Sequence, residues 1–230
     1  MSTETFAGIL LVALPVAFNV AFGLLATRFD YPDILRLPTT QVLERFQKEG
    51  PGLLILWWFF AMTAVVLAPA VVLLSASLTG ADGALLTTTT VVGVLAATVQ
   101  FLGLIRWPFL VPYLARTATD PSATPAQRET VDIVFQSFHR YLGVAVGEHL
   151  GYGLTGAWSV LAGIAMTQSS EVPASLGYIG IVAGAMLIIC AREFLGRYEL
   201  EGWAVAGRLT PLAYVLWSLW LVATGLVLLF

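Results

Sequence analysis

Long uncharged apolar stretches are the feature that most constrains what this chain can fold into. Residues 5–27 and 52–78 contain no charged side chain, and residues 208–230 contain only Arg208. A helix needs roughly 20 apolar residues to cross a bilayer. Charged residues make up 11% of the chain, whereas about a quarter of a soluble domain is charged. The sequence therefore predicts an integral membrane protein.

The apolar stretches predict an all-α, polytopic membrane protein with one domain over residues 1–230. Helices are expected because the bilayer core offers no water to satisfy backbone groups, and no stretch alternates as a barrel strand does. A bundle of six transmembrane helices is expected, with a short interfacial helix at about 40–49 between the first and second. The expected spans lie near residues 5–27, 52–78, 85–115, 131–168, 174–197 and 208–230.

All eleven Lys and Arg residues fall at the same ends of these spans. They flank the first, third and fifth connections, whereas the termini and the turns at 79–84 and 169–173 have none. The positive-inside rule therefore predicts cytoplasmic long connections and both termini on the extracytoplasmic side. The basic residues form no cluster, so nucleic acid is not an expected partner. They are Arg28, Arg36, Arg45, Lys48, Arg106, Arg116, Arg128, Arg140, Arg192, Arg197 and Arg208.

The first connection predicts a helix that lies in the headgroup region. Val42, Leu43 and Phe46 share one face of this helix, and charged residues occupy the other faces. Such a helix is either a connector on the membrane surface or a lid or partner site. Three tryptophans near the cytoplasmic interface are expected to anchor the helices there. They are Trp57, Trp58 and Trp107.

Small residues recur at every fourth position in the fourth span. Residues four apart are neighbours on a helix, and small side chains let membrane helices approach closely. We expect this span to be central and to serve two neighbours, because a spacing of four drifts by roughly 40° per step. A homodimer face is the alternative. The glycine stripe consists of Gly143, Gly147, Gly151, Thr155, Ser159 and Gly163.

Glu148 lies one step around the helix from this stripe. A charge inside a membrane costs about 2.5–3.5 kcal/mol, so an unpaired carboxylate is not expected there. Counting residues from the outer helix ends puts Glu148 roughly 27 Å deep and Arg106 roughly 24–28 Å deep. We therefore expect a Glu148–Arg106 pair in the inner leaflet, with Arg192 as the competing partner.

Other polar side chains are expected to share one cavity with this pair. They are Asn19, Gln100, His149 and Tyr152. One interpretation is a pocket for a ligand or substrate that opens to the cytoplasm. The other is a structural ion pair that fixes the register of the helices. Intramembrane charges favour a functional role, but a position near the interface weakens that rule, so the two interpretations are evenly balanced.

The two histidines do not predict a haem or a metal site. His139 and His149 are ten residues apart, or roughly 15 Å along one helix, so one chain cannot place them on the two faces of one haem. No cluster of His, Cys and carboxylates has the spacing of a zinc site. We expect no cofactor and no metal, and an enzyme or haem protein is the most remote of the hypotheses.

The sequence resembles a family of small bacterial multi-span membrane proteins known only as a domain of unknown function. The resemblance rests on the stretches FDYPDILR, VLERF, RWPFLVPYLA and GEHLGYGLTGAW, and it covers most of the chain. It implies six spans and a bacterial inner membrane, and it supplies no catalytic residue.

Two classes of function therefore lead. The first is the binding or transport of a small apolar or amphipathic molecule, or a lipid, at the polar site around Glu148 and Arg106. The second is a non-catalytic protein that assembles with membrane partners and uses the ion pair only for structure. Lipid or ligand density beside Glu148 favours the first class, and a dry core with an apolar face between subunits favours the second.

Overall fold

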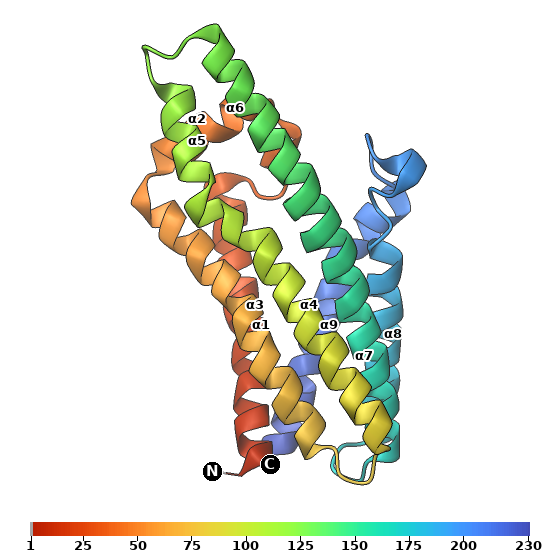
Figure 1. Cartoon of the computed structure of the whole chain (residues 1–230). Coiled ribbons are helices and arrows are strands. Elements are labelled where there is room, and N and C mark those ends of the chain that lie inside the picture. The colour runs from red at the N-terminus through yellow and green to blue at the C-terminus, as the bar shows by residue number, and fades with distance from the viewer. Residues whose placement is uncertain (1) are drawn as a thin grey trace.

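The apolar stretches form long helices that run side by side between two ends of the molecule (Figure 1). The computed structural model describes residues 2–230, and those residues include no strand. The long helices are α1 (Thr3–Phe29), α3 (Pro51–Ser77), α4 (Gly83–Phe109), α7 (Gly151–Gln168), α8 (Ala174–Cys190) and α9 (Ala204–Leu229). The shorter elements are η1 (Asp33–Arg36), α2 (Thr39–Glu49), α5 (Val111–Thr119), α6 (Pro125–Phe138), η2 (His139–Leu150) and η3 (Gly196–Tyr198).

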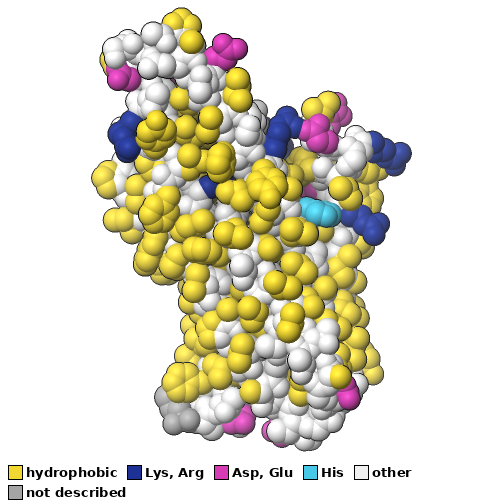
Figure 2. Space-filling model, in the orientation of Figure 1, with side chains coloured by type: hydrophobic (Ala, Val, Ile, Leu, Met, Phe, Trp, Pro, Cys, Tyr) yellow, Lys and Arg dark blue, Asp and Glu magenta, His cyan; other side chains and the backbone are white. Residues whose placement is uncertain are grey.

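One end of the bundle, which we call the basic end, carries the connections that follow α1, α5 and α8. These connections cover residues 30–38, 120–124 and 191–203. The start of α1, the end of α9 and the turns at 78–82 and 169–173 lie at the opposite, terminal end (Figure 1). Figure 2 shows Lys and Arg side chains only in the upper half of the visible face, toward the basic end. Apolar side chains cover most of the surface below them.

Four helical segments are long and apolar enough to cross a membrane. They are α1, α3, α9 and the nearly continuous rod of α4 and α5 over Gly83–Thr119. α8 is apolar but has only 17 residues. α7 has 18 residues, and its many glycine, serine and threonine residues make it less apolar than the others. The structure is therefore an all-helical protein of the membrane type with four candidate spans, fewer than the six expected.

The short helices α2, α5 and α6 form a cap at the basic end. The cap accounts for two differences from the expected spans. The third stretch continues to Thr119 as α5, beyond the expected end at 115. α6 begins at Pro125, before the expected start at 131, because Thr124 and Gln127 form a capping box around its first turn. α6 is mostly polar, so an apolar pattern did not reveal where it begins.

α8 ends at Cys190, whereas the expected fifth span reached residue 197. The chain turns after Cys190 and reaches Gly196 with a φ of 63°. Residues 191–195 form turns and a bend, and Gly196 starts the short η3. Residues 191–197 therefore belong to the connecting segment at the basic end.

A helix is present where the interfacial helix was expected, but its apolar face does not lie on lipid. Val42 and Leu43 are 0% exposed and Phe46 is 4% exposed. These side chains belong to the core that α2 shares with α1, α3, α4, α5 and α6. An ion pair between Arg28 and Glu49, 3.7 Å apart, also joins α2 to the end of α1. α2 is thus part of the cap.

Two clusters of buried apolar side chains fill the bundle. The terminal-end core contains side chains of α1, α3, α4, α7, α8 and α9 around Trp158 and Trp220. The basic-end core surrounds Trp57 and Trp107, whose rings stack with centroids 4.3 Å apart. These two tryptophans are buried, so they are not the interface anchors that the sequence predicted, whereas Trp58 is 46% exposed.

Candidate polar site between the two cores

The predicted polar residues lie in a zone between the two cores. On α4, Ala97 belongs to the terminal-end core and Trp107 belongs to the basic-end core. Gln100 and Arg106 therefore lie between them, and Asn19 occupies the corresponding zone of α1. We call this region the polar zone.

Glu148 and His149 lie on η2, a π-helical segment of 12 residues between α6 and α7. π-Helices are rare, mostly single turns, and frequent at functional sites. Their hydrogen bonds run from residue i to i+5, so each turn holds more than four residues. The drift of roughly 40° per step that an α-helix gives to a spacing of four therefore does not apply between Gly143 and Gly151.

The stripe residues near the middle of the chain's fourth stretch pack against α4. A Cβ at Gly147 would lie 3.1 Å from the Cα of Gly103, so the two backbones touch. Gly151 packs on the side chain of Gln100. The Nε2 of Gln100 also donates a hydrogen bond of 2.6 Å to the Oγ1 of Thr155. Stripe residues four apart, Gly147 and Gly151, thus pack against Gly103 and Gln100, which are three apart on α4. This is the packing of an i±4n row on one helix against an i±3n row on the other.

The later stripe residues contact two other helices. The Oγ of Ser159 accepts a hydrogen bond of 3.0 Å from the Nε1 of Trp217 on α9. Gly163 packs on the backbone of Gly177 on α8. The stripe is therefore occupied along its length by neighbours within the same chain.

Arg106 occupies the space that Gly143 leaves free. A Cβ at Gly143 would lie 2.6 Å from the Nη2 of Arg106. The Nη1 of Arg106 donates a hydrogen bond to the carbonyl oxygen of Gly103, three residues earlier on the same helix. Arg106 is half-buried. Its hydrogen-bond acceptor comes from its own helix, whereas the sequence predicted a carboxylate as its partner.

Glu148 is half-buried, and its carboxylate has no hydrogen bond or direct ion pair with any residue in the range 2–230. Neither Arg106 nor Arg192 pairs with it directly. Arg106 is still close enough for an electrostatic interaction with Glu148. Counting residues gives the height of a side chain along its helix, but not the direction in which a long arginine turns.

Tyr31 is a member of the polar zone that sequence reasoning missed. It follows α1, and its ring centroid lies 5.0 Å from that of Trp57. Burial raises the pKa of its phenol to about 12; the charge of Glu148 adds to this increase and that of Arg106 opposes it. The only signal in the sequence was its place in the stretch FDYPDILR, which does not indicate where the ring points.

Three other predicted residues link helices around the polar zone. The Nδ2 of Asn19 donates a hydrogen bond of 3.0 Å to the Oγ of Ser218 and so joins α1 to α9. The Nδ1 of His149 lies 2.6 Å from the carbonyl oxygen of Ala191, just beyond α8, so this nitrogen carries the hydrogen. Tyr152 packs its ring against α9. The polar zone is thus held by side chains of several helices.

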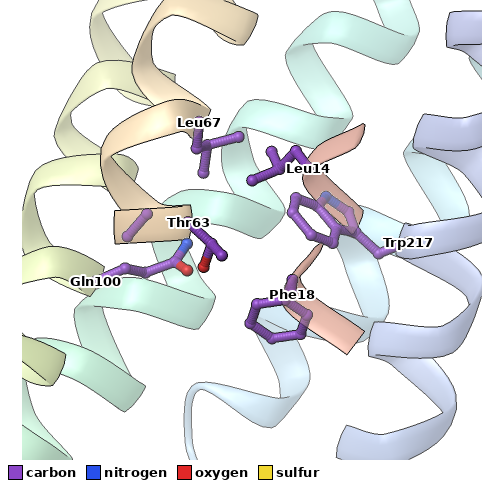
Figure 3. A pocket seen from close by; sticks show the side chains of 7 residues that line it. Leu14, Phe18, Thr63, Leu67, Gln100 and Trp217 are labelled. Atoms are coloured by element: carbon purple, nitrogen blue, oxygen red, sulfur yellow. The ribbon is translucent and has the colours of Figure 1, made fainter. Parts of the chain in front are cut away.

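A small gap lies beside Gln100, where α1, α3, α4 and α9 meet (Figure 3). Gln100 and Thr63 face Leu14, Phe18 and Trp217 across it. Its volume is about 10 Å³, which is room for about one water molecule. The gap is too small for a ligand, and Glu148 does not line it.

The two histidines have separate surroundings. In the described part of the chain, no group of three or more His, Cys, Asp and Glu side chains lies together. One nitrogen of His149 is already committed to Ala191. The ring of His139, the first residue of η2, stacks on the ring of Phe135 near the end of α6.

Comparison with known proteins identifies the family. Residues 6–225 match the family model described as domain of unknown function DUF4386. No curated protein and no solved structure matches the chain. The family match covers nearly the whole chain, and it confirms the resemblance that the sequence stretches suggested. The chain therefore belongs to the DUF4386 family.

Proposed function

We propose that this protein crosses a bacterial inner membrane six times and binds a small amphipathic molecule in the polar zone around Glu148 and Arg106. The two crossings beyond the four candidate spans are α7 and α8. Both extend to the turn at 169–173, which lies at the terminal end with the start of α1 (Figure 1). Their low hydropathy or short length is compatible with spanning because neighbouring helices cover them.

The charge asymmetry supports the orientation. All eleven Lys and Arg residues lie in the connections and cap helices at the basic end or near the helix ends that adjoin them. The positive-inside rule then places the basic end and its cap in the cytoplasm and both termini outside. In this orientation the polar zone lies in the inner leaflet, where both lipid and cytoplasm have access to it.

The observation that carries the ligand proposal is the carboxylate of Glu148. Glu148 is half-buried, and its carboxylate has no hydrogen-bond or ion-pair partner among residues 2–230, although a charge within the membrane costs about 2.5–3.5 kcal/mol. It also lies on a long π-helical segment, a conformation that is frequent at functional sites. A polar group of a bound molecule is the partner that the protein does not itself supply.

The second candidate is a structural protein that assembles with membrane partners. The small size of the gap beside Gln100 favours it, because that part of the interior is closely packed. In that case Glu148 and Arg106 only fix the arrangement of the helices. The two candidates differ in whether the purified protein carries a small molecule.

Native mass spectrometry of gently purified protein tests the proposal. We expect one small molecule bound to each wild-type chain and loss of this molecule in Glu148→Gln, because the amide removes the charge and keeps the shape. Glu129→Gln is the matched control, since Glu129 is an exposed residue of the cap. Binding that is equal in both variants, or a wild-type protein without any bound molecule, would refute the proposal.

A further inference from the structure

Five aromatic side chains form a continuous wall along the polar zone. The ring centroids of Tyr152 and Tyr214 lie 5.3 Å apart, and those of Tyr214 and Phe18 lie 5.7 Å apart. Phe18 continues to Phe22 at 6.4 Å, and Phe22 to Tyr31 at 5.8 Å. These rings come from α7, α9, α1 and the connection after α1. We call the five residues the aromatic wall.

The aromatic wall is not filled on all sides. Phe22 is 37% exposed, and the other four rings are half-buried, whereas Trp57 and Trp107 of the neighbouring core are fully buried. α1 and α9 touch at the terminal end, where Gly8 meets Gly225, and they spread apart toward the basic end (Figure 1). Protein therefore covers these five residues incompletely, and Phe22 is the most exposed of them.

Among residues 2–230, no Lys or Arg forms a direct ion pair with the carboxylate of Glu148 beside the wall. Glu148 is close enough to Tyr31, Tyr152 and Tyr214 to interact electrostatically with each of these side chains. Glu193, in the connection after α8, adds a second carboxylate near Glu148. Two guanidinium groups lie near these carboxylates. Arg36 interacts with Glu193, and Arg106 interacts with Glu148 but donates its hydrogen bond to the carbonyl oxygen of Gly103.

Aromatic faces and carboxylates attract the same kind of group. The quadrupole of an aromatic ring puts negative potential on its faces, so rings around a site bind ammonium groups, and quaternary ones in particular. A lone carboxylate adds long-range attraction for the same charge. An anionic head group would instead meet two carboxylates and the negative faces of the rings.

We infer that the site takes an amphipathic organic cation, with its charged group between Glu148 and the aromatic wall and its apolar part against the exposed side of Phe22 on α1. This inference rests on the proposed function and specifies its ligand class. The apolar part of the ligand gains contacts with the exposed side of Phe22, and the phenols of Tyr152 and Tyr214 lie beside its charged end.

Two probes of equal shape and opposite charge test this inference. Tetraphenylphosphonium and tetraphenylborate differ almost only in the sign of their charge, and their saturable binding to the purified protein in lipid nanodiscs is measured with empty nanodiscs subtracted. We expect saturable binding of tetraphenylphosphonium and at least about tenfold weaker binding of tetraphenylborate. Glu148→Gln should weaken the phosphonium by about tenfold, the change that 1.4 kcal/mol produces, and Glu129→Gln should leave it unchanged.

A second pair of variants tests the aromatic wall. Tyr214→Leu should weaken phosphonium binding by several-fold, because it removes one aromatic face. Tyr214→Phe should retain the affinity, because the face remains. Both variants are compared only after their unfolding midpoints are shown to be within a few degrees of wild type, so that a folding defect is not mistaken for a binding defect.

The outcomes separate this inference from the proposed function. Glu148-dependent binding that favours tetraphenylborate, or a co-purified anionic molecule that Glu148→Gln releases, overturns the cationic class and leaves the binding site intact. Phosphonium binding that is the same in wild type and Glu148→Gln overturns the inference. If neither probe binds and no molecule co-purifies, both proposals are overturned.

Discussion

Replacing Trp57 with alanine should lower the free energy of unfolding by about 3–5 kcal/mol, the usual cost of removing a large side chain from a core. Trp57 is 0% exposed and stacks on Trp107 with an interplanar angle of 7°. Its ring also lies within 6.2 Å of the ring of Phe29. The cap and the ends of α1, α3 and α4 meet around this stack, so the cavity left by the substitution cannot collapse easily.

The neighbouring tryptophan provides the control. Trp58 is 46% exposed, and Trp58→Ala should change the stability by less than about 1 kcal/mol. Cys190 serves as the reporter, because it is a free cysteine, 1% exposed, that a thiol-reactive dye reaches only when the bundle opens. Equal losses of stability in the two variants would show that Trp57 is an interface anchor and not part of a core.

Replacing Gly156 with leucine should cost about 3 kcal/mol or more, beyond the usual range for overpacking. A Cβ at this position would lie 2.5 Å from the carbonyl oxygen of Gly184 and 2.9 Å from the backbone nitrogen of Ile188. Backbone atoms cannot move aside as a flexible side chain can, so α7 and α8 would have to separate. The lost contacts between these helices would not be recovered elsewhere.

Gly23→Leu is the matched control for this substitution. Gly23 also lies inside a long apolar helix, and a Cβ there would have nothing within 4 Å. Since leucine favours a helix more than glycine does, this variant should be neutral or slightly stabilised. Thermal unfolding followed with the Cys190 reporter measures both. The packing of α7 on α8 is refuted if Gly156→Leu is as stable as Gly23→Leu.

The sequence could predict the helical membrane class and the one-sided charge because both depend on composition along the chain. Uncharged stretches such as 52–78 have few alternatives in a bilayer, and α3 begins at Pro51 and ends at Ser77. The amphipathic pattern of Val42, Leu43 and Phe46 also predicted a helix. The pattern did not show which surface covers the apolar face, since lipid and protein are both apolar.

The details of the site depend on the direction of side chains, and the sequence carries little information on that. The sequence predicted that Arg106 would turn to Glu148, but Arg106 turns to the carbonyl oxygen of Gly103. Nothing in the stretch from His139 to Leu150 indicated a π-helix. Tyr31 enters the polar zone from a connection outside the predicted spans, so a search restricted to spans could not find it.

The central claim, six crossings with the basic end in the cytoplasm, is tested most directly by cysteine accessibility. In a Cys190→Ser background, single cysteines replace Lys48, Arg197 and Ser170, all of which are exposed, and a membrane-impermeant maleimide is applied to intact cells and to inverted vesicles. Ser170 separates the two counts of spans, because four crossings without α7 and α8 would put it on the same side as Lys48. We predict labelling of positions 48 and 197 only in inverted vesicles and of position 170 only in intact cells. Labelling of 48 and 197 from opposite sides, or of 170 from the same side as 48, would contradict the account.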